Sequence, residues 1–116
     1  MQPGFGKSPA ALVERFDAVA ARHPQVERRK MFGYPALFVG GNLATSLYED
    51  RWVVRLFEDD LARLLELPGA APFSPMPGRS MKGWASLPAD LIREDAALDP
   101  WLDCAFAFAG SLPAKG

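Results

Sequence analysis

The chain has 116 residues, 49% of them hydrophobic and 23% charged, which suits one globular domain with a modest core. Its net charge of −1 excludes the strong overall positive field with which non-specific nucleic-acid binders attract phosphate. No apolar run approaches a membrane span, no segment has the pattern of a signal peptide, and the single cysteine cannot form an internal disulfide. We therefore expect a cytoplasmic protein.

The first predicted element is a helix that begins at Ser8 and Pro9. A serine hydroxyl caps free N–H groups at a helix start, and proline suits the first helical position. The helix ends near His23, because Pro24 disfavours a helical conformation in the residue before it. Its apolar face is predicted to pack on a sheet and consists of Leu12, Phe16, Val19 and Ala20.

The sheet is predicted from residues 27–57, against which the rest of the chain packs. Alternation indicates strands at 27–33, 35–39, 43–48 and 52–56, the first two being either separate strands or one strand with a kink. Gly40 and Gly41 can adopt the positive φ of a tight hairpin turn. Alternation also predicts which residues of a strand share one face. They are Leu37 and Val39 in the second strand, Leu43, Thr45 and Leu47 in the third, and Trp52, Val54 and Leu56 in the fourth.

The second half of the chain is predicted to hold three helical segments and one strand. A second helix follows Phe57 with three acids in its first turn and ends at Pro68. Five prolines between Pro68 and Pro88 argue against a central strand before about Ser80. A strand is predicted at 81–86, where Gly83 indicates a bulge or a close backbone approach. After a helical turn at 87–90, the last helix is predicted to open at Asp99-Pro100 and to close at Gly110.

Three features that resemble parts of active sites have simpler interpretations. Gly6-Lys7-Ser8 matches the last three residues of the phosphate-binding loop motif, but Met1 stands where that motif requires its first glycine. Ser80 and Lys82 would form a nucleophile and its base only beside an oxyanion hole that nothing in the sequence marks. The lone His23 and Cys104 are typical of a packing histidine and a buried thiol. We expect no metal, no cofactor and no catalytic residues, and therefore no enzyme.

The basic residues concentrate at Arg28, Arg29 and Lys30 and again at Arg79 and Lys82. Guanidinium and ammonium groups beside glycine-rich backbone can hold a phosphate or a carboxylate of a partner. The alternative is that they form the solvated face of the sheet or protect its edge. We predict them as a partner- or anion-binding site. If they converge, weak binding to a nucleic-acid backbone is the alternative function.

The last helix is apolar around roughly 200° of its circumference, about twice the stripe of a surface helix. A sheet covers only one side of it, so Phe106 on the flank needs another neighbour. Either the first helix or the proline-rich segment covers Phe106, or Phe106 forms an association surface for a second copy or a partner. We predict the association surface, most simply in a two-fold homodimer.

Two segments resemble a known family. The first is Arg29-Lys30-Met31-Phe32-Gly33 with Leu37-Phe38-Val39 behind it, and the second is Phe73-Ser74-Pro75-Met76-Pro77-Gly78-Arg79-Ser80-Met81-Lys82-Gly83-Trp84. The second is the more specific. It contains a proline-flanked methionine, then Gly-Arg, then Met-Lys-Gly and an aromatic residue, and this combination is unlikely to arise by chance from the composition of the chain. Together they resemble the TfoX N-terminal domain family, and the order of elements agrees from about Ser8 to Gly110.

The resemblance implies an α+β fold whose antiparallel sheet is flanked by helices in the order α-β-β-β-α-β-β-α. This fold is similar to that of secretion chaperones and of the MmcQ/YjbR group. No linker or repeat divides the chain, so we expect one domain over residues 1–116 with an ordered core from about residue 8 to residue 110.

The resemblance also implies a function in the regulation of DNA-uptake competence. Full-length regulators of this kind carry a second, C-terminal domain and assist a cyclic-AMP receptor protein at promoters. We therefore expect a non-enzymatic regulatory or protein-interaction module whose partner is a protein such as a transcription regulator, with no membrane contact. The alternatives are weak nucleic-acid binding through a local basic patch and, more distantly, a small-molecule enzyme with an anion site near Arg79.

Overall fold

Four helices and six strands follow one another in the part of the chain that the structure describes, residues 7–75, 78 and 81–114. Their bounds in this computed structural model are α1 (Ala10–Ala21), β1 (Glu27–Met31), β2 (Tyr34–Val39), β3 (Asn42–Tyr48), β4 (Arg51–Arg55), α2 (Glu58–Leu65), β5 (Ala71–Pro72), β6 (Trp84–Ser86), α3 (Ala89–Ile92) and α4 (Asp95–Ser111).

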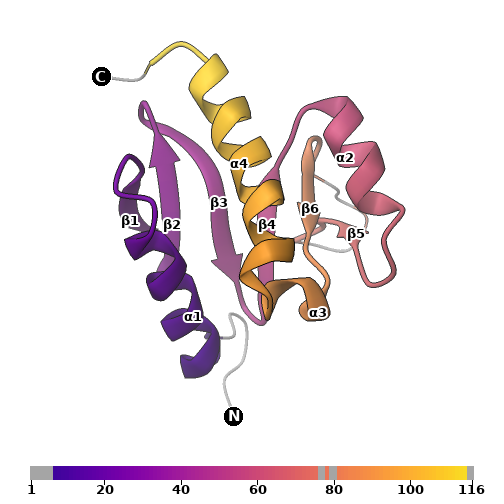
Figure 1. Ribbon diagram of the computed structural model, residues 1–116, viewed down its shortest axis with the longest axis horizontal. Helices are drawn as coiled ribbons and strands as arrows, with labels where there is room; N and C mark the ends of the chain where they lie inside the picture. Colours follow the sequence, from indigo (N-terminus) through magenta and orange to yellow (C-terminus); the bar gives the residue numbers. More distant parts are fainter. Residues whose placement is uncertain (1–6, 76–77, 79–80, 115–116) are drawn as a thin grey trace.

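The six strands form one antiparallel sheet in the order β1-β2-β3-β4-β6-β5. The helices α1 and α4 lie across one face of this sheet, α1 on β2 and α4 mainly on β3 and β4 (Figure 1). The predicted α+β class with an antiparallel sheet is confirmed. The order that the resemblance implies roughly matches; the additional elements are a fourth strand ahead of α2 and the short α3 ahead of α4, which alternation and the helical turn predicted at 87–90 had indicated.

The predicted meander is present, and its first two strands are separate. A tight turn at Phe32 and Gly33 divides β1 from β2, and both turn residues have positive φ, 54° and 83°. Gly40 and Gly41 also have positive φ, 59° and 81°, as the predicted hairpin turn between β2 and β3 requires.

One predicted side-chain direction in the meander is wrong. Leu37 pairs with Thr45, whereas Phe38 pairs with Leu43, so Ala44 is an extra residue in β3. This β-bulge reverses the side on which the preceding residue emerges. Leu43 therefore packs against a cluster on the face away from α1 and α4, while Leu47 stays in the main core.

The predicted starts of the first and last helices are also wrong. Ser8 does not cap α1, because its Oγ makes no hydrogen bond and the extended Pro9 is the cap residue, whose carbonyl oxygen accepts from the first turn. The helix α4 begins at Asp95, and Pro100 lies inside it. Asp99 does not act as a cap, because it lies within the helix, and its carboxylate accepts instead from Arg22, the residue after α1.

The proline-rich segment leads to the far edge of the sheet. The two-residue strand β5 ends in Pro72 and occupies the edge, where a residue without an N–H group is tolerated. The strand β6 begins at Trp84, later than predicted. Gly83, at φ 88°, precedes β6, and its carbonyl oxygen accepts a hydrogen bond from the Leu56 N–H at 3.0 Å. Glycine adopts this φ readily because it has no Cβ atom.

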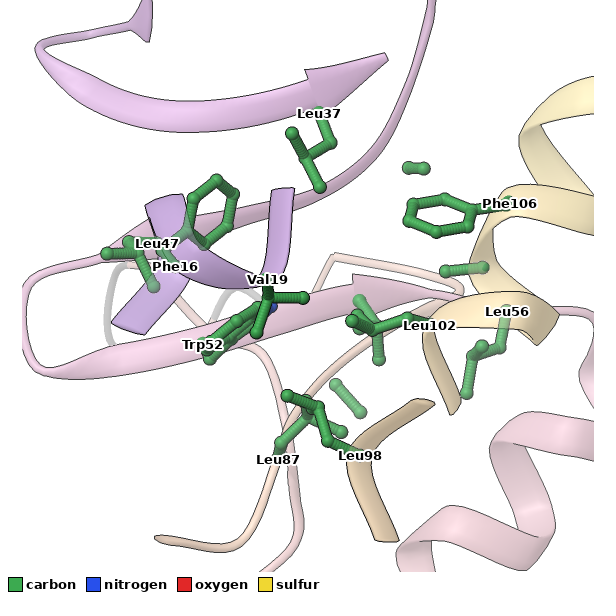
Figure 2. Packing of buried hydrophobic residues seen from close by; sticks show 14 of the residues in the cluster. Phe16, Val19, Leu37, Leu47, Trp52, Leu56, Leu87, Leu98, Leu102 and Phe106 are labelled. Atoms are coloured by element: carbon green, nitrogen blue, oxygen red, sulfur yellow. The ribbon is translucent and has the colours of Figure 1, made fainter. Parts of the chain in front are cut away.

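The main core lies between the sheet and the helices, with Trp52 at its centre (Figure 2). The Trp52 ring lies 4.9 Å from the Phe16 ring, centroid to centroid, and both side chains are fully buried. The indole N–H donates to the Thr45 hydroxyl at 2.8 Å, and that hydroxyl donates to the Val53 carbonyl at 2.6 Å. A buried indole with a satisfied donor adds its full apolar area to the core.

Phe106 belongs to this core and does not form an association surface. Its side chain is only 8% exposed, and the His23 ring at the end of the first helical segment packs edge-on against it at 5.2 Å. The end of the first helical segment therefore covers the flank of α4, so the prediction that Phe106 presents a hydrophobic patch is wrong.

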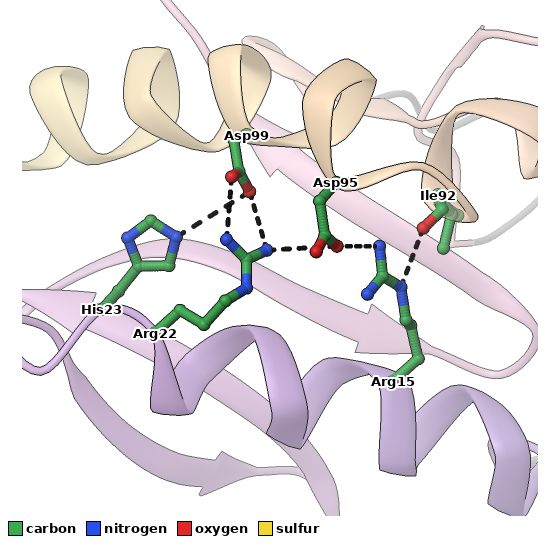
Figure 3. Close-up of polar contacts among 6 residues, drawn as sticks. All are labelled: Arg15, Arg22, His23, Ile92, Asp95 and Asp99. Carbon is green, nitrogen blue, oxygen red and sulfur yellow. Dashed lines mark hydrogen bonds and ion pairs between the residues drawn. The ribbon is translucent and has the colours of Figure 1, made fainter.

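A row of ion pairs joins α1 to α4 beside this contact (Figure 3). Arg22 donates to both carboxylate oxygens of Asp99, at 2.8 and 2.9 Å. Asp95 lies between two arginines, 2.6 Å from Arg15 and 3.3 Å from Arg22. The Arg22 hydrogen bond holds the pKa of Asp99 below its usual range.

The lowered pKa of Asp99 predicts a pH effect on stability. Because the pKa is lower in the folded chain, this pair stabilises the fold above about pH 4, and its contribution is lost as pH falls through the lowered pKa. Arg22→Gln should reduce stability at pH 7 by no more than about 1 kcal/mol, since both side chains are about a third exposed. The pH dependence between pH 5 and 2 should become shallower, as measured by thermal unfolding. Arg93→Gln, which removes a highly exposed pair, is the matched control; an identical effect in both variants would contradict the prediction.

Candidate functional site

The face of the sheet away from α1 and α4 carries a second, smaller apolar cluster. Residues that pair across neighbouring strands emerge on the same side, so Ala36, Ser46, Val53 and Ser86 mark this open face from β2 to β6. Val53 is the centre of the cluster, in which Phe73 and Trp84 are also buried. An antiparallel sheet can expose one face to water, and this one is instead apolar in its middle.

A pocket of about 200 Å³ opens over this cluster. We call it the open-face pocket. It is lined by Met31, Phe32, Tyr34, Leu43, Ser46, Leu47, Tyr48, Val53, Phe73, Pro75, Met81 and Trp84. The rings of Tyr34, Tyr48 and Phe73 contact one another in a row, at centroid distances of 5.4 and 5.2 Å. The bulge in β3 contributes directly, because it turns Leu43 into this lining.

The two segments that resemble a known family meet in this pocket. The end of β1 contributes Met31, the turn after it contributes Phe32, and the chain between β5 and β6 contributes Phe73, Pro75 and Met81. In sequence these segments are some forty residues apart, and four strands of the sheet lie between β1 and β5. Their convergence is the observation that singles out this pocket.

Phe32 is the unusual residue at the pocket. Its side chain is 92% exposed, more than any other large apolar side chain among the described residues. Its φ is 54°, a left-handed conformation that costs an L-residue roughly 1–2 kcal/mol. A phenylalanine that is both strained and exposed contributes little to folding. Such outliers cluster at functional sites, and Met81, 43% exposed, lies at the same pocket.

The chemistry of the pocket is that of an apolar binding site. None of the described residues that line it carries a charge, and its polar groups are the hydroxyls of Ser46, Tyr34 and Tyr48. Burial, and secondarily the nearby Glu49 carboxylate, raise the pKa of Tyr34 above its usual range, so this hydroxyl stays neutral. Within the described residues, no group of three or more histidine, cysteine or acidic side chains is placed to hold a metal ion.

Two of the predicted basic residues, Arg28 and Arg29, point to opposite faces of the sheet. Arg28 points toward α1 and donates to Asp17 at 2.7 Å, whereas Arg29 emerges on the opposite face and donates to Glu27 at 2.9 Å. Lys30 is exposed on the edge strand β1. Lys82 precedes β6 and lines a separate pocket beside Arg55 and Phe108. Arg79 and Ser80 lie outside the described residues.

The lone histidine and cysteine take structural positions. The His23 ring packs on Phe106, with its Nε2 buried and 4.0 Å from the Asp99 carboxylate. Cys104 is half-buried on α4, and burial raises the pKa of its thiol, which keeps it in the unreactive protonated form.

Sequence reasoning named the two segments but missed the pocket between them. Tyr48 and Val53 were missed, and Phe32 and Trp84 were named within the segments but not as site residues. One signal for the pocket was present in the sequence, namely the phenylalanine before the glycine of the turn. An apolar side chain in a turn stays exposed and does not stabilise the fold, so it suggests a binding role. Which face the chain between β5 and β6 covers could not be read from the sequence, because its prolines suppress alternation.

Comparisons with known proteins give one match. Residues 17–109 match the family model described as the TfoX N-terminal domain. No curated protein and no solved structure matches the chain. The described helices are too short or too polar to cross a membrane; α4, with 17 residues, is the longest among them.

Proposed function

The chain belongs to the TfoX N-terminal domain family, and from this premise we propose that it is a non-enzymatic regulatory module that binds a partner protein through the open-face pocket. The observation that carries the proposal is that both family-like segments line this one apolar pocket. The partner we propose is a transcription regulator, in keeping with the resemblance to competence regulators.

The pocket has the size to receive one side chain of the partner. A cavity of about 150 Å³ lined by aliphatic and aromatic groups is enough to bind a benzene ring, and the open-face pocket measures about 200 Å³. Burying one aromatic or large aliphatic side chain contributes roughly 1.5–3 kcal/mol. Interfaces commonly depend on a few such anchors seated in desolvated pockets. Phe32, exposed at the rim, would cover the anchor once it is seated.

Two observations favour a protein partner over the alternatives. The uncharged lining supplies neither the acid and base of a hydrolytic site nor the cationic donors that usually hold a phosphate. Among the described basic residues, Arg28 and Arg29 are neutralised by carboxylates on opposite faces of the sheet. A nucleic-acid backbone needs several unpaired cations on one surface.

Photo-crosslinking tests the proposal. A benzoylphenylalanine in place of Phe32 should crosslink a specific protein in cells that express the chain. The same group in place of Ala107, which is exposed on α4 beyond the other face of the sheet, is the matched control. The captured protein should then bind the purified chain, and Val53→Asp, which puts a charge into the pocket, should abolish the crosslink. Equal capture at both positions, or capture that survives Val53→Asp in a folded variant, would contradict the proposal.

A duplex titration distinguishes the nucleic-acid alternative. We expect no measurable binding of a fluorescent DNA duplex at low salt. Duplex binding that weakens with salt and drops on reversal of the Arg79 and Lys82 charges would favour that alternative instead.

A further inference from the structure

A second pocket, of about 320 Å³, lies where β4 runs into α2 and contains an arginine that sequence reasoning did not single out. It is lined by Arg55, Leu56, Phe57, Glu58, Leu61, Lys82, Gly83 and Phe108. We call it the Arg55 pocket. The chain at 81–84 separates it from the open-face pocket, since Met81 and Trp84 line one and Lys82 and Gly83 line the other.

The Arg55 side chain packs against an aromatic ring but has no carboxylate to balance its charge among the described residues. Its guanidinium carbon lies 4.8 Å from the centre of the Phe108 ring, in a cation–π contact that fixes the plane of the group. Its Nε is buried without a hydrogen-bond partner. Among the described residues no carboxylate pairs with Arg55, in contrast to Arg15, Arg22, Arg28, Arg29, Arg63 and Arg93, each of which has one. A buried, unpaired guanidinium donor is costly unless a ligand satisfies it.

The charges of the pocket determine which anion fits. Arg55 and Lys82 contribute two positive charges, and Glu58 is the acid in the lining, so the described lining has a net charge of +1. A monoanion brings this to zero, whereas a dianion would leave an excess negative charge beside Glu58. The planar guanidinium matches a carboxylate in two parallel hydrogen bonds.

The rest of the lining is apolar and leaves room for more than a carboxylate. Phe57 is 42% exposed, and its ring meets that of Phe108 edge-on at 4.8 Å. Leu56 and Leu61 complete the apolar wall. We propose that the Arg55 pocket binds an organic monocarboxylate with an apolar or aromatic body, with the carboxylate on Arg55 and Lys82 and the body against Phe57. The site shares no lining residue with the open-face pocket, so it stands independently of the function proposed above.

The test is a two-dimensional NMR titration of the full chain with phenylacetate and with N-acetylphenylalanine, the first standing for a free small acid and the second for a peptide C-terminus. At least one should shift the amide resonances of Phe57, Lys82, Gly83 and Phe108 saturably, and the tighter of the two identifies the source of the carboxylate. Their neutral amides should bind at least tenfold more weakly, and so should phenyl phosphate as a dianion. Arg55→Gln should weaken binding about tenfold or more.

Two further variants keep this test decisive if Arg55→Gln unfolds. Lys82→Gln alters an exposed side chain and should still weaken binding several-fold, whereas Lys30→Gln, an exposed cation on β1, should leave it unchanged. No saturable shift with either acid, equal binding of the neutral amides, tighter binding of phenyl phosphate, or binding indifferent to both Arg55→Gln and Lys82→Gln would each overturn the proposal.

Discussion

Replacing Trp52 by alanine is expected to lower the free energy of unfolding by about 3–5 kcal/mol, measured by urea denaturation. Trp52 is fully buried, contacts Phe16 and donates its indole N–H to Thr45. Alanine would leave a large cavity between α1 and the sheet that the backbone cannot collapse to fill. A domain of this size has a total stability of about 5–15 kcal/mol, so the variant would be partly unfolded at 37 °C.

Two matched variants show whether burial is the cause. Trp52→Phe keeps a ring in the core and loses mainly the hydrogen bond to Thr45, so it should cost much less than Trp52→Ala. Trp101→Ala removes a half-buried indole on α4, with the Arg63 guanidinium 5.1 Å from the centre of its ring, and should cost less than half as much as Trp52→Ala. A cost below about 1 kcal/mol for Trp52→Ala would contradict the packing of α1 on the sheet.

Replacing Phe32 by glycine is expected to stabilise the fold while it weakens partner binding. Glycine adopts a φ of 54° without the roughly 1–2 kcal/mol that phenylalanine incurs, and about 0.5–1 kcal/mol of that gain is offset by the greater freedom of glycine in the unfolded chain. Because the ring is 92% exposed, little packing is lost. We therefore expect a gain of about 0.5–1 kcal/mol in urea denaturation.

The same substitution should weaken binding of the crosslinked partner about thirtyfold, the effect of losing a contact worth about 2 kcal/mol. Glu49→Gly is the matched control, because Glu49 also has a φ of 54°, in the turn between β3 and β4, and does not line the pocket. It should relieve similar strain and weaken partner binding much less than Phe32→Gly does. Destabilisation by Phe32→Gly, with no effect on binding, would show that Phe32 has a structural role only.

The sequence predicts the sheet of this protein better than its functional surface. Alternation placed Leu37, Trp52 and Val54 in the core correctly, because the buried face of a one-sided sheet dominates the apolar pattern. Alternation failed at Leu43, because a bulge at Ala44 leaves no trace in the order of apolar and polar residues. That one shifted residue helps to make the open face apolar.

The predicted sites failed for a related reason. Charge density along the chain suggested Arg28, Arg29 and Lys30, yet consecutive residues of a strand point to opposite faces. Carboxylates also pair with the two arginines, that of Asp17 in α1 with Arg28 and that of Glu27 in the same strand with Arg29. Conversely, Phe106 looked exposed because the position of His23 beyond α1 could not be known from periodicity. The resemblance identified both segments of the open-face pocket, but only the fold brings Met31 and Met81 together.

These two methionines offer the most direct measurement of where the partner binds. With ¹³C-methyl methionine in the chain, Met31 and Met81 report on the open-face pocket, and single leucine substitutions assign their resonances. When the protein captured at position 32 is added, both methyl resonances should shift or broaden together, and in Val53→Asp neither should change. Binding of the partner with both resonances unmoved would place the interface elsewhere and contradict the role proposed for the open-face pocket.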